Sequence, residues 1–300
     1  MSATQRTGAA TRRTGPPFWM AVPALAFFGL FALVPLIGVV VLSFMSWDGL
    51  GTPAWAGLDS WRATLADPVT RQAMWLTAVF VVGSFLIQAP VSLLLGVFMA
   101  GRHRYRALLS VLYFLPLLFS SAAIGITFKA LLDPNFGLSR AFGTQLLARN
   151  WLGSPDLALY TVMFVVGWAF IPFHSLLYQA GVRQIPAALY EAATLDGAGR
   201  VKQFFYVTLP QLRYTIVTSS TLMLVGSLTY FDLVFVLTAG GPGNATRILP
   251  LDMYLRGFRS YEMGQASAIA VILVAVGLTL SLVLNRVSGA GRMESQQAGL

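Results

Sequence analysis

Long apolar runs alternate with short polar segments along the whole chain. A helix needs about 20 mostly apolar residues to cross the hydrocarbon core of a bilayer, and six runs satisfy this. They cover residues 18–44, 74–100, 107–128, 157–177, 214–231 and 266–284. Because a segment inside a bilayer must satisfy its backbone hydrogen bonds internally, we expect each run to form a helix. The pattern predicts an all-α membrane protein with a six-helix transmembrane bundle over residues 18–284.

Prolines inside these runs indicate how the helices associate. They are Pro23, Pro35, Pro90, Pro116 and Pro172. Membrane helices tolerate proline where neighbouring helices cover the freed carbonyl groups. We therefore expect a packed bundle of kinked helices and not six independent anchors.

Charge predicts the orientation of the bundle. Lys and Arg favour the cytoplasmic side of a membrane. With the N-terminus inside, the cytoplasmic segments carry the whole net charge of +9, and the outer segments hold equal numbers of acidic and basic residues. Residues 1–17 and 285–300 are then cytoplasmic tails of a multi-pass plasma-membrane protein. Since topology explains the basic excess, we expect membrane lipid and no nucleic acid as a partner.

Composition narrows the possible chemistry. The chain is 56% hydrophobic and only 10% charged, it has no Cys, and it has two His. Disulfides, thiolate metal sites and cysteine catalysis are thereby excluded, and we expect neither a metal site nor an enzyme. Lys129 and Lys202 are followed by Ala130 and Gln203, so neither lysine belongs to a P-loop, and the chain does not bind ATP by that device.

The segment over residues 179–213, on the expected cytoplasmic side, has a pattern of its own. Pro186 suits the first turn of a helix, and the residues up to Leu195 are good helix formers. Asp-Gly-Ala-Gly over residues 196–199 breaks that helix, and a second short helix is expected over residues 201–207 before Pro210 opens the fifth run. From this pattern alone, an amphipathic connector resting on the lipid head groups is an equally good interpretation.

The fifth run is the most polar of the six. One helical face carries its polar residues at three- and four-residue steps, and the members of this face are Ser219, Ser220, Met223, Ser227 and Tyr230. Such a face suits a solute pathway and helix packing through small residues equally well. The candidate pathway residues are Ser220, Ser227, Tyr230 and Asp232, of which Asp232 lies just beyond the run. His174, late in the fourth run, is more typical of hydrogen-bonded packing than of a proton relay.

One motif in the 179–213 segment resembles a known family signature. Residues 191–197 read Glu-Ala-Ala-Thr-Leu-Asp-Gly, and nine residues later 207–210 read Val-Thr-Leu-Pro. This spacing resembles the EAA signature of membrane subunits of binding-protein-dependent ABC importers, with Val207 in place of the usual Ile. Residues 133–137, 237–246 and 264–268 are similar to stretches of the carbohydrate permeases of that superfamily. We call residues 179–213 the EAA loop.

The resemblance implies specific partners and roles. Residues 186–195 would form a coupling helix seated in a groove of a separate ATPase subunit, two copies of which would bind ATP and Mg while this chain holds no cofactor. Glu191 would make the charged contact, Ala192 and Ala193 would allow close approach, and Asp196 and Gly197 would form the turn. A second permease subunit would complete a heterodimer, and an extracellular solute-binding protein would deliver a sugar or oligosaccharide.

Other readings remain open at this point. An importer of glycerol 3-phosphate would favour basic groups along its pathway, yet the six runs contain no Lys or Arg. A polyamine importer would favour acidic groups, and only Asp232 is near. A secondary carrier or channel predicts transport without ATP and a dispensable Glu191. A membrane enzyme lacks an acid–base pair inside the bundle. The pattern favours a neutral solute.

Overall fold

The computed structural model of the chain describes residues 18–101 and 103–288. Most of this part is helical. Within it, a single two-stranded hairpin forms where β1 (Met45–Ser46) pairs antiparallel with β2 (Ala54–Trp55). The tail expected over residues 1–17 and most of the tail over 285–300 lie outside the described residues.

Among the described residues, four helical segments are long and apolar enough to cross a membrane. They are Trp19–Leu42, which joins η1 (Phe18–Ala21), α1 (Val22–Phe28), the π-helical η2 (Gly29–Leu33) and α2 (Val34–Leu42), then α4 (Pro68–Met99), α8 (Pro155–Arg183) and α15 (Met263–Ser288). Two bent pairs raise the number to six when each pair counts as one span. They are α5 (Arg104–Phe114) and η3 (Leu115–Leu118) with α6 (Ser121–Leu131), and α12 (Arg213–Ser227) with α13 (Asp232–Thr238).

The prediction of one continuous helix over residues 107–128 is wrong. The two halves of this segment meet at an angle of 99°. Pro116 lies in the 3₁₀ turn η3, Phe119 is extended, and the Ser120 hydroxyl accepts a hydrogen bond of 3.2 Å from the Ala123 N–H to begin α6. A proline that cannot donate and a serine that caps a new helix thus end one helix and start another. The fifth run bends less, by 47°.

The core of the bundle is the crossing of α4 and α8. A Cβ at Gly96 would lie 2.5 Å from Cβ of Tyr178 and 2.6 Å from the carbonyl oxygen of Ser175. Only a glycine allows this approach, as is common where membrane helices pack through small residues. Further along the crossing, Phe80 and Met163 are buried with apolar residues of α6 and α13. The expected packed bundle is therefore built around this helix pair.

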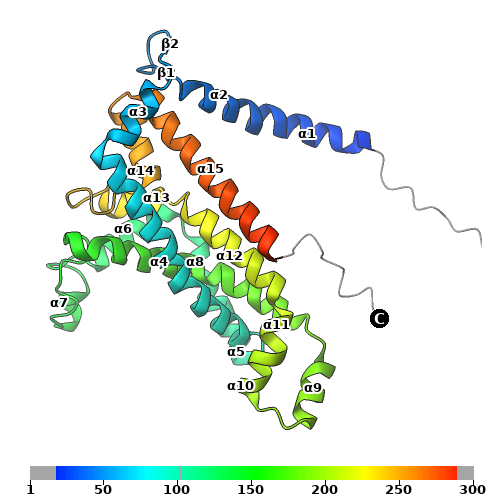
Figure 1. The fold of residues 1–300 in the computed structure, drawn as a ribbon. Helices are drawn as coiled ribbons and strands as arrows, with labels where there is room; N and C mark the ends of the chain where they lie inside the picture. Colours follow the sequence, from blue (N-terminus) through cyan, green and yellow to red (C-terminus); the bar gives the residue numbers. More distant parts are fainter. Residues whose placement is uncertain (1–17, 102, 289–300) are drawn as a thin grey trace, which may run out of the picture.

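The first span stands apart from the bundle. Figure 1 shows α1 and α2 leading away from it, with α2 alongside α15. None of the most apolar stretch of Trp19–Leu42 is buried within the chain. Apart from the contact of α2 with α15, this segment therefore offers its apolar surface to lipid or to another protein.

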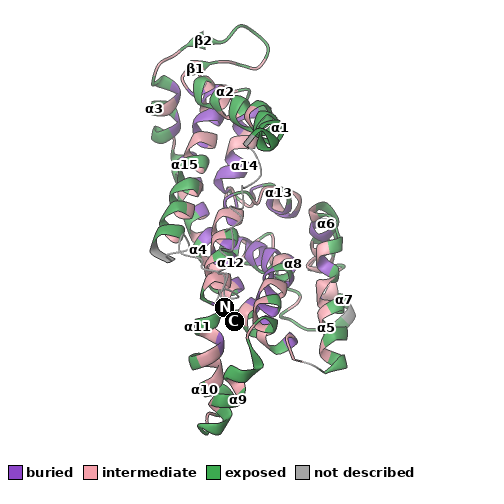
Figure 2. Cartoon of the chain, turned by 90° about the vertical axis from the view of Figure 1, so that its right-hand side faces the viewer, coloured by how far each residue is buried: buried purple, intermediate pink, exposed green. Residues whose placement is uncertain are grey.

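Short helices lie in the segments that join the spans. They are α3 (Asp59–Ala66), α7 (Leu138–Phe142), α9 (Ala187–Leu195), α10 (Arg200–Gln203), the π-helical η4 (Phe204–Thr208), α11 (Leu209–Gln211), α14 (Leu249–Tyr254) and the π-helical η5 (Leu255–Arg259). In Figure 1, α9 to α11 project at one end, while α3 and α14 lie at the other. Figure 2 shows that α9 and α10 are mostly exposed, whereas buried residues line α14 and the centre of the bundle.

Candidate functional site

The EAA loop forms the helix, turn and helix that its sequence predicts, but the second helix continues through Pro210 to Gln211. The prediction that Pro210 opens the fifth run is wrong, because α12 begins at Arg213. Pro186 is the N-cap of α9 and not its first helical residue. At the other end, Gly197 adopts a positive φ of 75°, the Ala198 N–H donates to Ala193 O at 2.8 Å, and the Gly197 N–H donates to Thr194 O at 3.0 Å. This pair of bonds is the Schellman arrangement, which favours glycine at the left-handed position.

Side-chain bonds fix the angle between α9 and the segment that follows it. The Tyr190 hydroxyl lies 2.9 Å from the Thr208 hydroxyl. The Gln203 amide nitrogen donates to the Thr194 hydroxyl and to the Ala198 carbonyl, each at 3.0 Å. The loop is therefore a braced unit in which side-chain bonds hold α9 and its turn to α10 and η4.

The signature residues lie on the exposed side of this unit. Glu191, Ala192, Asp196 and Gly197 are exposed, and Ala193 is half-buried. Neither acidic side chain makes a hydrogen bond or an ion pair with any other residue that the structure describes.

A large apolar side chain stands beside them. Leu195 is 89% exposed. A single exposed apolar side chain is common on protein surfaces, so Leu195 by itself does not mark an interface.

The candidate pathway residues separate into two groups. Ser220 and Ser227 are buried on the face of α12 that the spacing predicts, and the Ser227 hydroxyl donates to Met223 O of its own helix at 2.7 Å. Tyr230 follows the end of α12, and its ring stacks on Phe170 with 4.7 Å between centroids. Asp232 begins α13 and is exposed, apart from the other three.

Sequence reasoning missed a polar stripe on α4. Ser84, Gln88 and Ser92 follow one another at four-residue steps, and all three are fully buried. Within the described part of the chain, the Ser84 hydroxyl and the Gln88 amide have no hydrogen-bond partner. The four-residue spacing inside the second run was the available signal.

One hydrogen-bond contact of His174 and one of Gln179 extend this polar interior across the bundle. His174 Nδ1 lies 3.0 Å from the Ser219 hydroxyl and joins α8 to α12. The Gln179 amide donates to Met99 O at 3.0 Å and joins α8 to the end of α4. His174 therefore has the packing role that its isolation in an apolar run favoured.

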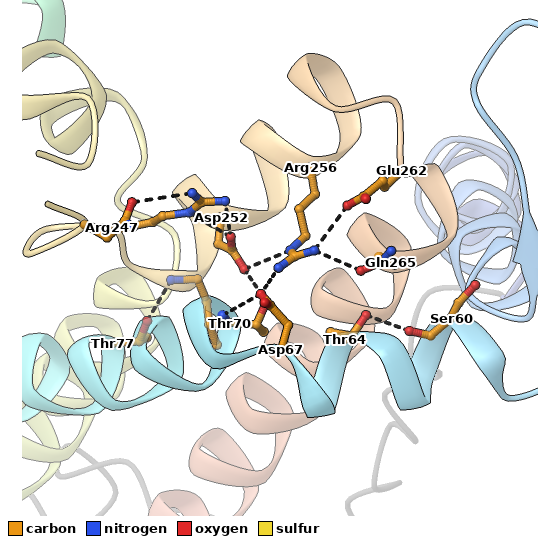
Figure 3. A network of polar contacts seen from close by, with 12 residues as sticks. Ser60, Thr64, Asp67, Thr70, Thr77, Arg247, Asp252, Arg256, Glu262 and Gln265 are labelled. Atoms are coloured by element: carbon orange, nitrogen blue, oxygen red, sulfur yellow. Dashed lines mark hydrogen bonds and ion pairs between the residues drawn. The ribbon is translucent and has the colours of Figure 1, made fainter.

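Figure 3 shows a network of charged side chains around α14, which lies at the opposite end of the molecule from the EAA loop (Figure 1). Its centre is Asp252 of α14, whose side chain is 0% exposed. The Asp252 carboxylate accepts hydrogen bonds from the Thr70 hydroxyl at 2.8 Å, from Arg247 Nε at 2.8 Å, and from Arg256 Nε at 3.4 Å. A buried carboxylate with several donors is compensated for the loss of water.

Arg256 extends this network to two further elements. Its guanidinium pairs with Asp67 at the start of α4, and with Glu262 at 3.1 Å and Gln265 at 2.9 Å around the start of α15. Burial alone would raise the pKa of Asp67, but the hydrogen bond from the Thr70 N–H and the charge of Arg256 bring the pKa below its ordinary value of 3.8. We call Asp67, Thr70, Arg247, Asp252, Arg256, Glu262 and Gln265 the α14 network.

Comparison with known proteins agrees with this architecture. Residues 92–291 match the family described as binding-protein-dependent transport system inner membrane component. The probable ABC transporter permease protein YurN of Bacillus subtilis (strain 168) is 33% identical over 93% of this chain and 97% of its own length. The arabinooligosaccharides transport system permease protein AraP of the same organism is 28% identical over 93% and 90%.

A solved structure has the same fold. It is a bacterial alginate ABC transporter in complex with an alginate pentasaccharide-bound periplasmic protein, with a TM-score of 0.78, 22% identity, and coverage of 90% of this chain and 93% of that one. The family is a transport component of the inner membrane and not an enzyme, as the sequence predicts. The chain belongs to the binding-protein-dependent transport system inner membrane components, the membrane subunits of ABC importers.

Proposed function

We propose that this chain carries a sugar or oligosaccharide across the plasma membrane as one half of a permease heterodimer. The relative AraP is named for arabinooligosaccharides, and the solved transporter with this fold is named for alginate. The six apolar runs contain no Lys or Arg, which favours a neutral solute over a phosphate ester. Ser220, Ser227, Tyr230 and Asp232 are the candidate pathway residues of this chain.

The proposed orientation places the EAA loop and both tails in the cytoplasm. Two copies of an ATPase subunit bind there with their ATP and Mg, and this chain holds no cofactor. The α14 end then faces outward, where a solute-binding protein delivers the sugar. The distribution of Lys and Arg along the sequence supports this arrangement.

In this proposal α9 is the coupling helix. Glu191 makes the charged contact with the ATPase subunit, Ala192 and Ala193 allow close approach, and Asp196 and Gly197 form the turn. The observation that carries the proposal is that Glu191 and Asp196 are exposed on a braced helix and have no partner among the described residues. Such a surface is complete only when another protein covers it.

The test is purification of the chain at native expression in mild detergent, followed by mass spectrometry of the proteins that accompany it. We expect a second, different six-span chain and an ATPase with a P-loop. Reconstitution with the neighbouring binding protein then compares ATP-driven uptake of neutral oligosaccharides, glycerol 3-phosphate and polyamines. Recovery of the chain alone, with transport in liposomes that lack ATP, would contradict the proposal and favour a secondary carrier.

A further inference from the structure

A large crevice lies between the EAA loop and the turn that joins α4 to α5. Its volume is about 790 Å³. Gly101 and Arg104 line it from the α4–α5 turn, Arg183 from the end of α8, and Glu191 and Arg200 from the α9–α10 segment. The walls thus come from two parts of the chain that are distant in sequence, the α4–α5 turn and the EAA loop, and these parts meet where the spans end.

The charge of this crevice is strongly positive. Arg104, Arg106, Arg183 and Arg200 line it, and Glu191 is the one carboxylate among the lining residues. Arg106 is held in place, because its guanidinium donates to Phe98 O at 2.8 Å and lies 4.6 Å from the centroid of the Phe98 ring.

The other three arginines are available to a ligand. Arg104, Arg183 and Arg200 are exposed, and none of them makes an ion pair or a side-chain hydrogen bond with another residue of the described chain. Clustered cations in a concave site attract an anion. Guanidinium groups are well suited to the oxygens of a phosphate because their N–H donors form a fixed fork.

The surroundings of the crevice indicate which kind of phosphate would enter it. Leu94, Phe98, Leu108 and Val111 are exposed apolar side chains of α4 and α5, the two helices that lead to the crevice. Tyr105, also exposed, lies at the start of α5, and such aromatic residues are enriched at the membrane–water interface. An acyl chain can follow the apolar helices while its head group occupies the basic crevice.

We propose that this crevice binds the phosphate head group of an anionic phospholipid through Arg104, Arg183 and Arg200. The inference rests on the proposed orientation, which puts the EAA loop at the cytoplasmic surface. Tyr190 and Glu191 of α9 line the same crevice. A lipid bound there contacts the wall formed by the coupling helix, so the lipid links membrane composition to the position of α9.

The test uses the assembled transporter, with its partner subunits, in nanodiscs of phosphatidylcholine that contain increasing amounts of phosphatidylglycerol. Native mass spectrometry measures the retained anionic lipid. The variant Arg183→Gln/Arg200→Gln should bind it about 30-fold more weakly, because each basic residue near a membrane surface contributes a factor of about five. The control Arg71→Gln/Arg149→Gln removes the same charge from exposed positions elsewhere in the chain and should retain binding.

A second arm identifies the source of the phosphate. Millimolar inorganic phosphate is added to complexes in pure phosphatidylcholine, and its binding is followed by the unfolding temperature. No stabilisation, with lipid binding lost only in the crevice variant, supports a phospholipid. Stabilisation that the crevice variant lacks supports the phosphate site and assigns it to a soluble anion.

Two results would overturn the inference. In one, both double variants retain or lose the anionic lipid equally. In the other, the crevice variant keeps the lipid but loses the ATPase subunit, which would assign the arginines to that protein. Because lipid retention is measured without transport, loss of this inference leaves the proposed function intact when ATP-driven uptake is normal.

Discussion

The charged residues at the two ends of the molecule differ in burial and in pairing. At the α14 end, Asp252 and Arg256 are buried, and each has several partners within the chain. At the end formed by the EAA loop, Glu191, Arg183 and Arg200 are exposed and have no side-chain partner among the described residues. Both ends are charged and both consist of short helices, so composition alone does not separate them.

This contrast separates charges that stabilise the fold from charges that are free to contact another molecule. A buried charge is tolerated only when partners inside the fold replace its water, so the α14 network serves the structure of this chain. An exposed charge without a partner adds little to the fold, because water hydrates it, and it is free to contact another molecule. Substitutions at the first end should therefore change stability, and substitutions at the second should change coupling.

The largest effect on stability is expected from Asp252→Ala. It leaves Arg247 and Arg256 without their shared carboxylate, and removal of one partner from a buried pair costs about 3–5 kcal/mol. The unfolding temperature of the purified chain in detergent should fall accordingly. The matched control is Asp59→Ala, which breaks an ion pair to Arg62 whose side chains are 76% and 75% exposed, and should cost less than about 1 kcal/mol. Equal losses in both variants would contradict a structural role for the α14 network.

The second expected effect concerns activity and not stability. Glu191→Lys reverses the charge of the proposed coupling contact, and a lost charge pair at an interface commonly costs a few kcal/mol, so ATP-driven uptake should fall by at least about tenfold. The unfolding temperature should stay unchanged, because Glu191 has no partner among the described residues. Uptake in proteoliposomes and thermal unfolding are measured on the same preparation. Asp59→Lys at the opposite end is the control for charge reversal, and normal uptake by the Glu191 variant would refute the coupling role.

Local chemistry explains which parts of this structure the sequence predicts. The six apolar runs follow from hydropathy, and the turn after α9 follows from Gly197, whose positive φ favours glycine. Neither the apolar runs nor this turn depends on contacts between residues that are distant in sequence. The EAA loop was therefore predictable in outline. Pro186 caps α9 and does not lie within it, and the second helix runs on through Pro210 to Gln211, so that α12 begins at Arg213.

Long-range and mid-membrane features were not predictable in the same way. The break between α5 and α6 depends on Pro116 and Ser120 acting together within an apolar run, and apolarity sets the length of a run without setting its continuity. The α14 network depends on Thr70 meeting Asp252, residues that only tertiary packing brings together. A single sequence does not show which charged residues between the apolar runs will be buried in the folded chain.

The smallest expected effect is a pH dependence that comes from Asp67. In the folded chain the pKa of Asp67 lies below its ordinary value of 3.8, so the unfolded chain binds this proton more tightly than the folded one. The stabilisation is therefore complete above the ordinary pKa and is lost as the pH falls through the lower, folded pKa.

Asp67→Asn isolates this contribution, because asparagine is also a good N-cap and can keep the hydrogen bond to the Thr70 N–H while removing the charge that faces Arg256. The wild type should exceed the variant in stability by about 1 kcal/mol or less near neutral pH, since a partly exposed ion pair contributes little. Unfolding temperatures measured from neutral pH down to about pH 2 should begin to converge below about pH 4 and should meet only below the folded pKa of Asp67. A difference that stays constant across that range would mean that the pairing of Asp67 with Arg256 adds no charge-dependent stability, and the α14 end would then differ from the EAA loop through Asp252 alone.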